Sequence, residues 1–335
     1  MYFTTMDSLK EIMAYPNMKN WIRFLFLKDT YGFFPQEYAH LPLRATAFLG
    51  KTSWGDDLRG VCDQLVDTAN LVVDLTEGRK ECLRLSDFTD WAPGDEDDTN
   101  ASTFLITPGK HPVDKEQRPA MVICPGGAYS FVSFQNEGTP IADLATKKGY
   151  RCFMLNYRTA SHATYPNPQM DLLHAIAYVR DHAEEYGVDP KRVIAVGFSA
   201  GGHLVASTAG VAEELLPEGK PDAVVLGYPV ITLQDTYTHQ ETKENLVGMD
   251  DDLKNRLSAE RQVDATYPPT FAWACEDDDC VPSKNTTFLK EALEVYDVPQ
   301  ECHIYPWGGH GCGLAFGNSA YGWSEVMFAF LDQVL

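Results

Sequence analysis

Positive charge is scarce in this sequence. Its 335 residues include 27 lysines and arginines against 48 aspartates and glutamates, which gives a net charge of −21. Proteins that bind nucleic acid or anionic membrane surfaces usually offer basic patches to the phosphates. The charge therefore argues against nucleic acid and membrane partners and leaves neutral or cationic molecules as candidate substrates. The 44% of hydrophobic residues still provides for a sizeable core.

The sequence also lacks a membrane-directed segment. Residues 1–7 show no basic region followed by an apolar run, and no apolar run elsewhere is long enough to span a bilayer. We therefore expect no signal peptide, no membrane partner and, by default, a cytoplasmic location. A homo-oligomer is compatible with the sequence.

No C-x-x-C pair occurs among the eight cysteines. Free, mostly buried thiols are therefore expected. Cys280 and Cys312 flank the candidate catalytic loops described below, and the sequence leaves open whether they meet. Four other cysteines lie in runs that are typical of strands: Cys124, Cys152, Cys275 and Cys302.

Residues 1–80 differ from the rest of the chain. Their apolar side chains recur with helical spacing, which predicts a small helical appendage with helices at 7–14, 18–28 and 56–75. A Pro- and aromatic-rich link lies at 31–35. Packing against the main domain is the favoured role of the appendage. A cover for the active site or support for an oligomer are the alternatives.

Residues 81–335 alternate short apolar runs with helical patterns. This alternation predicts an α/β domain, with a mostly parallel eight-stranded sheet and helices on both faces. The predicted strands are 81–88, 102–107, 120–124, 151–156, 192–197, 223–228, 270–275 and 301–305. The predicted helices are 137–148, 168–186, 200–214, 283–296 and 321–334. An acidic run at 95–98 favours a solvated loop over a cation site.

The stretch Ile194–His203 contains a G-x-S-x-G motif centred on Ser199, between a β-branched run and the start of a helix. A serine on such a sharp turn has a strained backbone, and side chains at Gly197 or Gly201 would collide there. The turn presents the hydroxyl at the carboxyl edge of the sheet, where ligands of parallel sheets bind. Ser199 is therefore the candidate nucleophile.

A serine nucleophile needs a base. His310 is the candidate because it follows the last predicted strand in the glycine-rich loop 308–311, from which an imidazole can reach the serine. For the other histidines considered, packing or a solvated face is the favoured role, because they lie on predicted helices or a strand: His174, His182, His203 and His303.

The orienting acid is expected in the run Glu276–Pro282, directly after the strand at 270–275. Asp278 is preferred because it begins the pattern D-x-x-V-P, and Asp277 is the alternative. Either choice gives the chain order Ser…Asp…His, which is one of the known orders of a catalytic triad. A charged loop or a metal site is the competing interpretation of these aspartates.

Glycines after the strand at 120–124 can expose backbone N–H groups to an oxyanion. Two aromatic residues, Tyr129 and Trp307, flank the site, where they either stack on a sugar ring, line an acyl pocket or simply pack. The candidate oxyanion-hole donors are the N–H groups of Gly127, Ala128 and Ala200.

These motifs resemble those of the α/β-hydrolase superfamily, in its esterase/lipase branch, over residues 100 to 335. More narrowly, they resemble the BD-FAE-like and acetylxylan-esterase-like carbohydrate esterases. The hormone-sensitive-lipase branch has a histidine before its oxyanion glycines, where this chain has Pro125, and a third glycine in place of Ala128. The matching stretches are Pro125–Tyr129, Leu155–Arg158, Gly197–Leu204, Pro268–Phe271, Asp277–Pro282 and Gly308–Leu314.

The resemblance implies a serine carboxylic ester hydrolase, without cofactor or metal, that deacetylates carbohydrates or cleaves their short-acyl esters. The expected partner is a small-molecule or oligosaccharide ester. Two other functions are considered. A peptidase of the prolyl-oligopeptidase type shares the triad, but the chain lacks the length for a propeller domain. A non-catalytic binding protein on a hydrolase scaffold would not need all three triad residues.

Overall fold

One sheet organises the part of the chain that the computed structural model describes, which is residues 2–25, 38–46, 58–85, 100–110 and 116–335. Its strand order is β1-β2-β4-β3-β5-β6-β7-β8. The pairs β1–β2 and β2–β4 are antiparallel, and all later pairs are parallel. The strands are β1 Cys82–Arg84, β2 Phe104–Ile106, β3 Arg118–Cys124, β4 Arg151–Asn156, β5 Val188–Phe198, β6 Ala223–Gly227, β7 Thr270–Cys275 and β8 Gln300–Tyr305.

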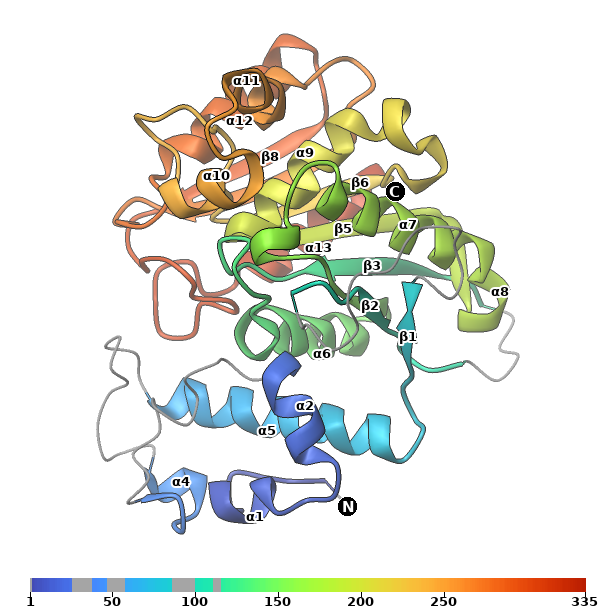
Figure 1. Cartoon of the computed structure of the whole chain (residues 1–335), viewed down its shortest axis with the longest axis vertical. Coiled ribbons are helices and arrows are strands. Elements are labelled where there is room, and N and C mark those ends of the chain that lie inside the picture. Colours follow the sequence, from blue (N-terminus) through green and yellow to red (C-terminus); the bar gives the residue numbers. More distant parts are fainter. Residues whose placement is uncertain (1, 26–37, 47–57, 86–99, 111–115) are drawn as a thin grey trace.

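The predicted α/β-hydrolase architecture is confirmed, with helices on both faces of a mostly parallel sheet (Figure 1). Helices α7, α8, α9 and α12 share one core with the sheet, and α6 and α13 share the other. The helices of this part are α6 Thr139–Lys147, α7 Asn167–Asp181, α8 Ala183–Tyr186, α9 Ser199–Leu215, α10 Gln240–Val247, α11 Asp251–Leu257, α12 Lys284–Val295 and α13 Trp323–Val334.

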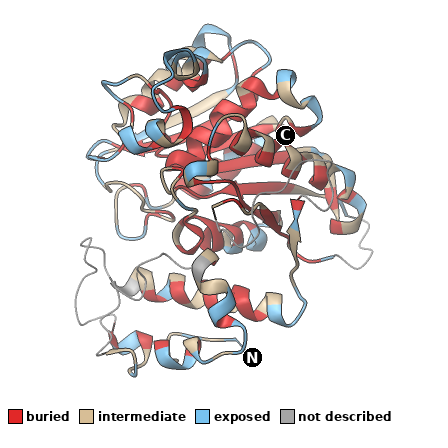
Figure 2. Ribbon diagram, viewed as in Figure 1, coloured by how far each residue is buried: buried red, intermediate tan, exposed pale blue. Residues whose placement is uncertain are grey.

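The sequence of strand β3 contributes side chains to the hydrophobic cores on both faces of the sheet. Successive side chains of a strand point to opposite faces of the sheet. Ala120 and Val122 accordingly join one core, whereas Met121 and Ile123 join the other. All four are fully buried, and Figure 2 shows the central strands buried between the helical layers. An apolar run without alternation is what a sheet covered on both faces requires.

The predicted long helix at 168–186 is interrupted in the structure. His182 has φ −107° and ψ 20°, so α7 ends before it and α8 begins after it. Its Nδ1 lies 2.9 Å from the carbonyl of Tyr178, which closes the last turn of α7. Gly187 then ends α8 with a left-handed φ of 64°. The predicted helix at 137–148 is preceded by a π-helical turn, Phe134–Gly138, which the sequence did not predict.

The N-terminal helices pack outside α6 (Figure 1). The ring of Phe24 lies 5.3 Å from that of Phe104 on β2, and Leu25 is fully buried. Phe24 and Leu25 thus have the packing role that was favoured for the appendage. The helices are α1 Leu9–Met13, α2 Met18–Leu25, α4 Leu43–Thr46 and α5 Leu58–Thr76. The domain boundary at residue 80 stays a prediction.

Several predicted features lie outside the described residues. They are the ends of the expected segments at 18–28, 56–75 and 81–88, the link at 31–35 and the acidic run at 95–98.

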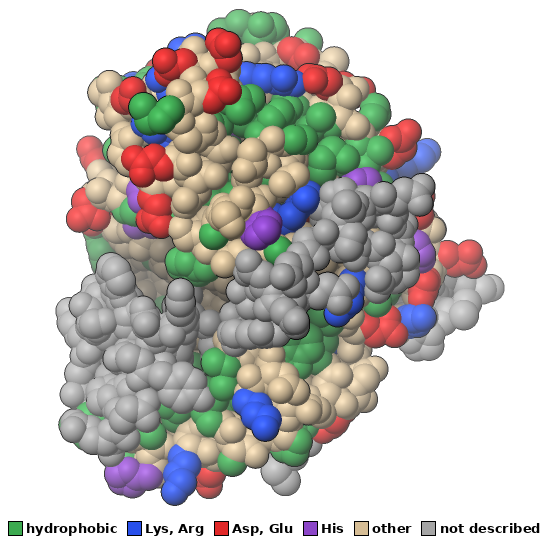
Figure 3. All heavy atoms as spheres, in the orientation of Figure 1, with side chains coloured by type: hydrophobic (Ala, Val, Ile, Leu, Met, Phe, Trp, Pro, Cys, Tyr) green, Lys and Arg blue, Asp and Glu red, His purple; other side chains and the backbone are tan. Residues whose placement is uncertain are grey.

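Acidic side chains are prominent on the upper part of the face shown in Figure 3, with Lys and Arg side chains among them. Ion pairs form in the segment between β6 and β7, where Lys243 lies 2.7 Å from Asp235 and Lys254 lies 2.5 Å from Asp251. Among the helices that the structure describes, none has the length and apolar character needed to cross a membrane.

Candidate active site

Ser199 occupies the junction of β5 and α9, with a left-handed φ of 53°. Such a conformation is strained for a residue with a side chain and needs support from its surroundings. The flanking glycines permit it. A Cβ at Gly197 would lie 2.2 Å from the carbonyl oxygen of Gly201, and one at Gly201 would lie 2.1 Å from that of Cys124. The motif thus lets the turn pack directly against the end of β3.

The candidate base lies within hydrogen-bond distance of the candidate nucleophile. His310 Nε2 is 2.8 Å from Ser199 Oγ, and His310 Nδ1 is 2.7 Å from Asp278 Oδ2. The carboxylate of Asp278 is fully buried, and 18% of the His310 side chain is exposed. The three predicted triad residues therefore form one continuous chain of hydrogen bonds at the carboxyl edge of the sheet.

The neighbouring aspartates have different partners. Asp278 Oδ1 accepts the N–H groups of Cys280 and Val281 at 3.0 and 2.8 Å, which leaves its other oxygen to face the imidazole. Asp277 turns to the loop that carries His310. Its Oδ1 accepts the N–H groups of Gly308 and Gly309 at 2.8 and 2.9 Å. Of the two carboxylates, the one that contacts the imidazole is therefore that of Asp278.

The predicted oxyanion loop is wound in left-handed turns. Gly127 has φ 126° and Ala128 has φ 55°. Gly126 passes so close to the serine that a Cβ there would lie 2.8 Å from Ser199 Cβ. Asn245 on α10 donates to the carbonyl of Ala128 at 2.9 Å. The hydrogen bond from Asn245 thereby connects the oxyanion loop to the segment between β6 and β7.

The backbone donors of this loop remain available. Within the described residues, the N–H groups of Gly127 and Ala128 have no acceptor. Ala200 is in the first turn of α9, where N–H groups lack a helical partner. An N-terminal helix turn also carries a partial positive charge that stabilises an anion.

Tyr129 does not face the site. It is fully buried, and its hydroxyl lies 3.0 Å from His203 Nδ1. The expectation that its ring stacks on a substrate is therefore corrected in favour of the packing alternative. Tyr129 has a left-handed φ of 59°, and its ring packs edge-on against the rings of Tyr157 and His203. Trp307, by contrast, is 53% exposed on the loop that leads to His310.

His203 is fully buried, and each of its ring nitrogens has a hydrogen-bond partner. Its Nε2 lies 2.8 Å from the carbonyl of Leu257, to which it donates, so Nδ1 accepts the hydroxyl of Tyr129. Burial lowers the pKa of His203 to about 4. This places it in a packing role, as its position on the helix predicted.

We expect His203 to make the protein sensitive to acid. In the unfolded chain its pKa is about 6.5, so on acidification the unfolded state gains this proton first. Stability is then lost as the pH falls from about 6.5 to about 4, by up to about 3 kcal/mol. Urea unfolding over this range should show a steeper decline for wild type than for His203→Gln, whose amide can serve both partners. Parallel declines would contradict the assignment.

Three polar residues around the site were not predicted, of which Glu137 and Tyr228 are buried and Asn245 is half-buried. Glu137 accepts the N–H of Gly126 at 2.6 Å and the hydroxyl of Tyr228 at 2.8 Å. The ring centroid of Tyr228 lies 4.9 Å from that of His310. Asn245 holds the oxyanion loop from α10, as described above. In the sequence, Glu137 begins a predicted helix, Tyr228 ends a predicted strand and Asn245 lies in a polar segment, and none of these features is specific to a functional site.

The cysteines are free thiols in the described residues, as expected. Cys312 interacts with Cys275, at the end of β7. A contact between Cys312 and Cys280, which the sequence left open, is not found in the described residues. Cys280 is exposed. Among the described residues, no three His, Cys, Asp or Glu side chains are arranged to hold a metal ion.

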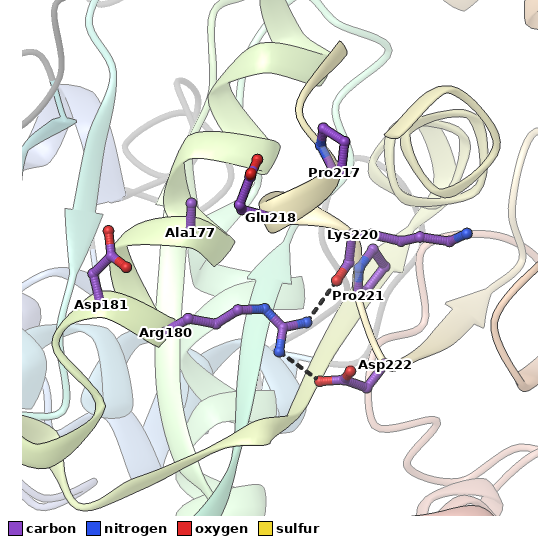
Figure 4. A pocket seen from close by; sticks show the side chains of 8 residues that line it. All are labelled: Ala177, Arg180, Asp181, Pro217, Glu218, Lys220, Pro221 and Asp222. Atoms are coloured by element: carbon purple, nitrogen blue, oxygen red, sulfur yellow. Dashed lines mark hydrogen bonds and ion pairs between the residues drawn. The ribbon is translucent and has the colours of Figure 1, made fainter. Parts of the chain in front are cut away.

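A groove of about 440 Å³ lies elsewhere on the molecule (Figure 4). It sits where β6 begins, so it is at the end of the sheet opposite to Ser199. Arg180 donates there to the carbonyl of Lys220 at 2.6 Å and lies 3.0 Å from Asp222. These groups already satisfy one another, so we assign no role to the groove.

Known proteins match the region that holds this geometry. The family model BD-FAE matches residues 110–293, more than half of the chain. This chain belongs to the BD-FAE family. It has the fold of an esterase-like α/β-hydrolase, as predicted.

Two curated relatives match this BD-FAE protein over the same number of residues. It is 33% identical over 224 residues to an acetylxylan esterase of Xylanibacter ruminicola, covering 64% of this chain and 43% of that protein. It is also 33% identical over 224 residues to endo-1,4-beta-xylanase B of Butyrivibrio fibrisolvens, covering 63% of this chain and 35% of that protein. The chain thus spans less than half of the length of these curated relatives.

Solved structures cover the same region. An acetyl ester-xyloside bifunctional hydrolase from Caldicellulosiruptor lactoaceticus superposes with a TM-score of 0.65 at 29% identity, over 76% of this chain and 96% of that one. The carboxylesterase Cest-2923 from Lactobacillus plantarum superposes with a TM-score of 0.61 at 27% identity, over 69% of this chain and 92% of that one.

Proposed function

We propose that this BD-FAE family member is a serine carboxylic ester hydrolase that uses Ser199, His310 and Asp278. The observation that carries the proposal is the chain of contacts from Ser199 Oγ through the imidazole to the buried carboxylate, at 2.8 and 2.7 Å. The same three residue types in this arrangement activate serine in unrelated hydrolases. The relatives named as esterases give the reaction type.

In the proposed mechanism, Ser199 Oγ attacks the acyl carbon while His310 Nε2 takes its proton. Asp278 fixes the tautomer of the ring through Nδ1 and stabilises the imidazolium that forms. The N–H groups of Gly127, Ala128 and Ala200 bind the oxyanion. His310 then gives the proton to the leaving alcohol, and a water molecule, deprotonated by the same ring, releases the acid from Ser199.

We propose a short acyl group, chiefly acetyl, on a carbohydrate alcohol as the substrate. The names of the acetylxylan esterase and of the acetyl ester-xyloside hydrolase support this class. The segment between β6 and β7 also supports it. It carries the short helices α10 and α11, whose surface is largely polar, with exposed Glu241 and Glu244. Such a segment offers little apolar surface to a long acyl chain.

Rates on p-nitrophenyl esters should fall from acetate through butyrate and octanoate to palmitate. Each buried CH₂ contributes about 0.8 kcal/mol only where an apolar surface receives it. The natural alcohol is tested with acetylated xylo-oligosaccharides, from which acetate release should be measurable. A kcat/KM that peaks at octanoate or a longer acid would contradict the carbohydrate-esterase assignment.

The peptidase alternative is tested beside these assays with aminoacyl anilides. Hydrolysis of the esters without hydrolysis of the anilides is the expected result. A non-catalytic protein would turn over neither class, and activity on anilides that exceeds activity on aryl esters would favour a peptidase instead.

A further inference from the structure

A buried carboxylate lies directly behind the proposed site. Glu137 is 3% exposed and belongs to the π-helical turn Phe134–Gly138. Within the described residues it makes no ion pair with a lysine or arginine. Burial raises its pKa, while its two hydrogen-bond donors act in the opposite direction. A carboxylate is costly to bury without a cation, and π-helical turns often occur at functional sites.

The first oxygen of Glu137 holds the oxyanion loop. Its Oε2 accepts the N–H of Gly126 at 2.6 Å. Gly126 directly precedes the two residues whose N–H groups are the proposed donors, and it is packed against Ser199. Fixing the plane of the peptide before Gly126 restricts the direction of the N–H groups that follow.

The second oxygen holds the loop of the base. Its Oε1 accepts the hydroxyl of Tyr228 at 2.8 Å, and that hydroxyl accepts the N–H of Gly313 at 2.9 Å. The ring of Tyr228 meets the imidazole of His310 edge-on, at an interplanar angle of 64°. The residue before Glu137 reaches the same loop, since Asn136 Nδ2 donates to the carbonyl of Gly311 at 2.8 Å. The loop of the base is thus tied to one turn at Gly311 and Gly313, on the C-terminal side of His310.

The turn itself is anchored in the core. Phe134 stacks on Phe104 with ring centroids 6.0 Å apart and an interplanar angle of 9°. Phe24 of α2 in turn packs edge-on against Phe104. The N-terminal helices therefore support the turn that carries Glu137.

We propose that Glu137 is a positioning residue that fixes the oxyanion loop relative to His310. It acts through Gly126 on one side and through Tyr228 on the other, without contacting the substrate. This role rests on the serine mechanism proposed above. Catalysis depends on this relative placement, because oxyanion donors act only when they sit at the position where the charge develops.

Two variants test the proposal. Glu137→Gln retains the shape but has one acceptor oxygen, so at least one of the two accepted hydrogen bonds is lost or replaced by a donated one. Tyr228→Phe removes the link to Gly313 and leaves the carboxylate on Gly126. Glu260→Gln is the matched control, because burial also raises the pKa of Glu260 and, within the described residues, none of its hydrogen bonds or ion pairs reaches Gly126, Ser199 or His310.

On p-nitrophenyl acetate, both test variants should lower kcat by about 10- to 100-fold with KM within about threefold of wild type. Glu260→Gln should keep its kcat within about twofold of wild type. A thermal unfolding midpoint measured for each variant shows that it is folded. If Glu137→Gln does not fold, Tyr228→Phe alone decides.

Folded variants that keep kcat within about twofold of wild type, or that change KM alone, would overturn the positioning role. The proposed function fails separately. An inactive wild type, or an active Ser199→Ala variant, would remove the serine mechanism and the inference with it. An active wild type beside an inactive Ser199→Ala and unaffected Glu137 and Tyr228 variants would remove the inference alone.

Discussion

Ser199→Ala should abolish ester hydrolysis while the fold is retained. The substitution removes the hydroxyl whose oxygen lies 2.8 Å from His310 Nε2, and no other hydrogen bond of that hydroxyl is found in the described residues. Loss of the nucleophile of a triad costs about 10⁶ in kcat. Steady-state rates on p-nitrophenyl acetate, with freshly purified wild type as reference, measure the effect.

The control for Ser199→Ala is its thermal unfolding midpoint. Alanine has the same preference against the left-handed φ of 53° as serine, so the midpoint should stay close to that of wild type. A variant that keeps a tenth of the wild-type kcat would show that Ser199 is not the nucleophile.

Asp278→Asn should reduce kcat about a hundredfold or more beyond the loss in Asp277→Asn. In Asp278→Asn, Oδ1 can still accept the N–H groups of Cys280 and Val281. The new amide group would then face His310 Nδ1 and favour the wrong tautomer of the ring. Measured kcat values for the two variants give the ratio.

Asp277→Asn is the matched control because it changes the adjacent carboxylate to the same amide. Its Oδ1 can go on accepting the N–H groups of Gly308 and Gly309, so the loop should keep its shape. If the greater loss falls on Asp277→Asn, the orienting acid is Asp277 and the proposed assignment is wrong.

The sequence could predict where chemistry-bearing residues gather, because each candidate follows a strand of a mostly parallel sheet. The ends of β3, β5, β7 and β8 lie along one edge, so the loops after them meet in space. The glycines of the G-x-S-x-G turn distinguished Ser199 from other serines as the candidate nucleophile, because neither Gly197 nor Gly201 has room for a side chain. The choice between Asp277 and Asp278 rested on spacing alone, and the contacts with the imidazole depend on how each side chain turns.

Side-chain direction explains what the sequence could not predict. Tyr129 is next to the oxyanion loop in sequence, but its hydroxyl points into the core and contacts His203. Glu137 has the sequence context of an ordinary helix start. The π-helical turn instead places its carboxylate against Gly126 and Tyr228. Tyr228 is far from both Gly126 and Glu137 along the chain. Contacts of this kind depend on the tertiary packing of several loops.

Covalent labelling tests the serine mechanism most directly. Wild-type protein is treated with a fluorophosphonate, and its residual esterase activity, intact mass and digested peptides are followed together. The mechanism predicts one adduct for each chain, located on Ser199, with activity lost in proportion to labelling, and no adduct on Ser199→Ala. An adduct on a different residue that accompanies the loss of activity, or full activity after complete labelling of Ser199, would contradict it.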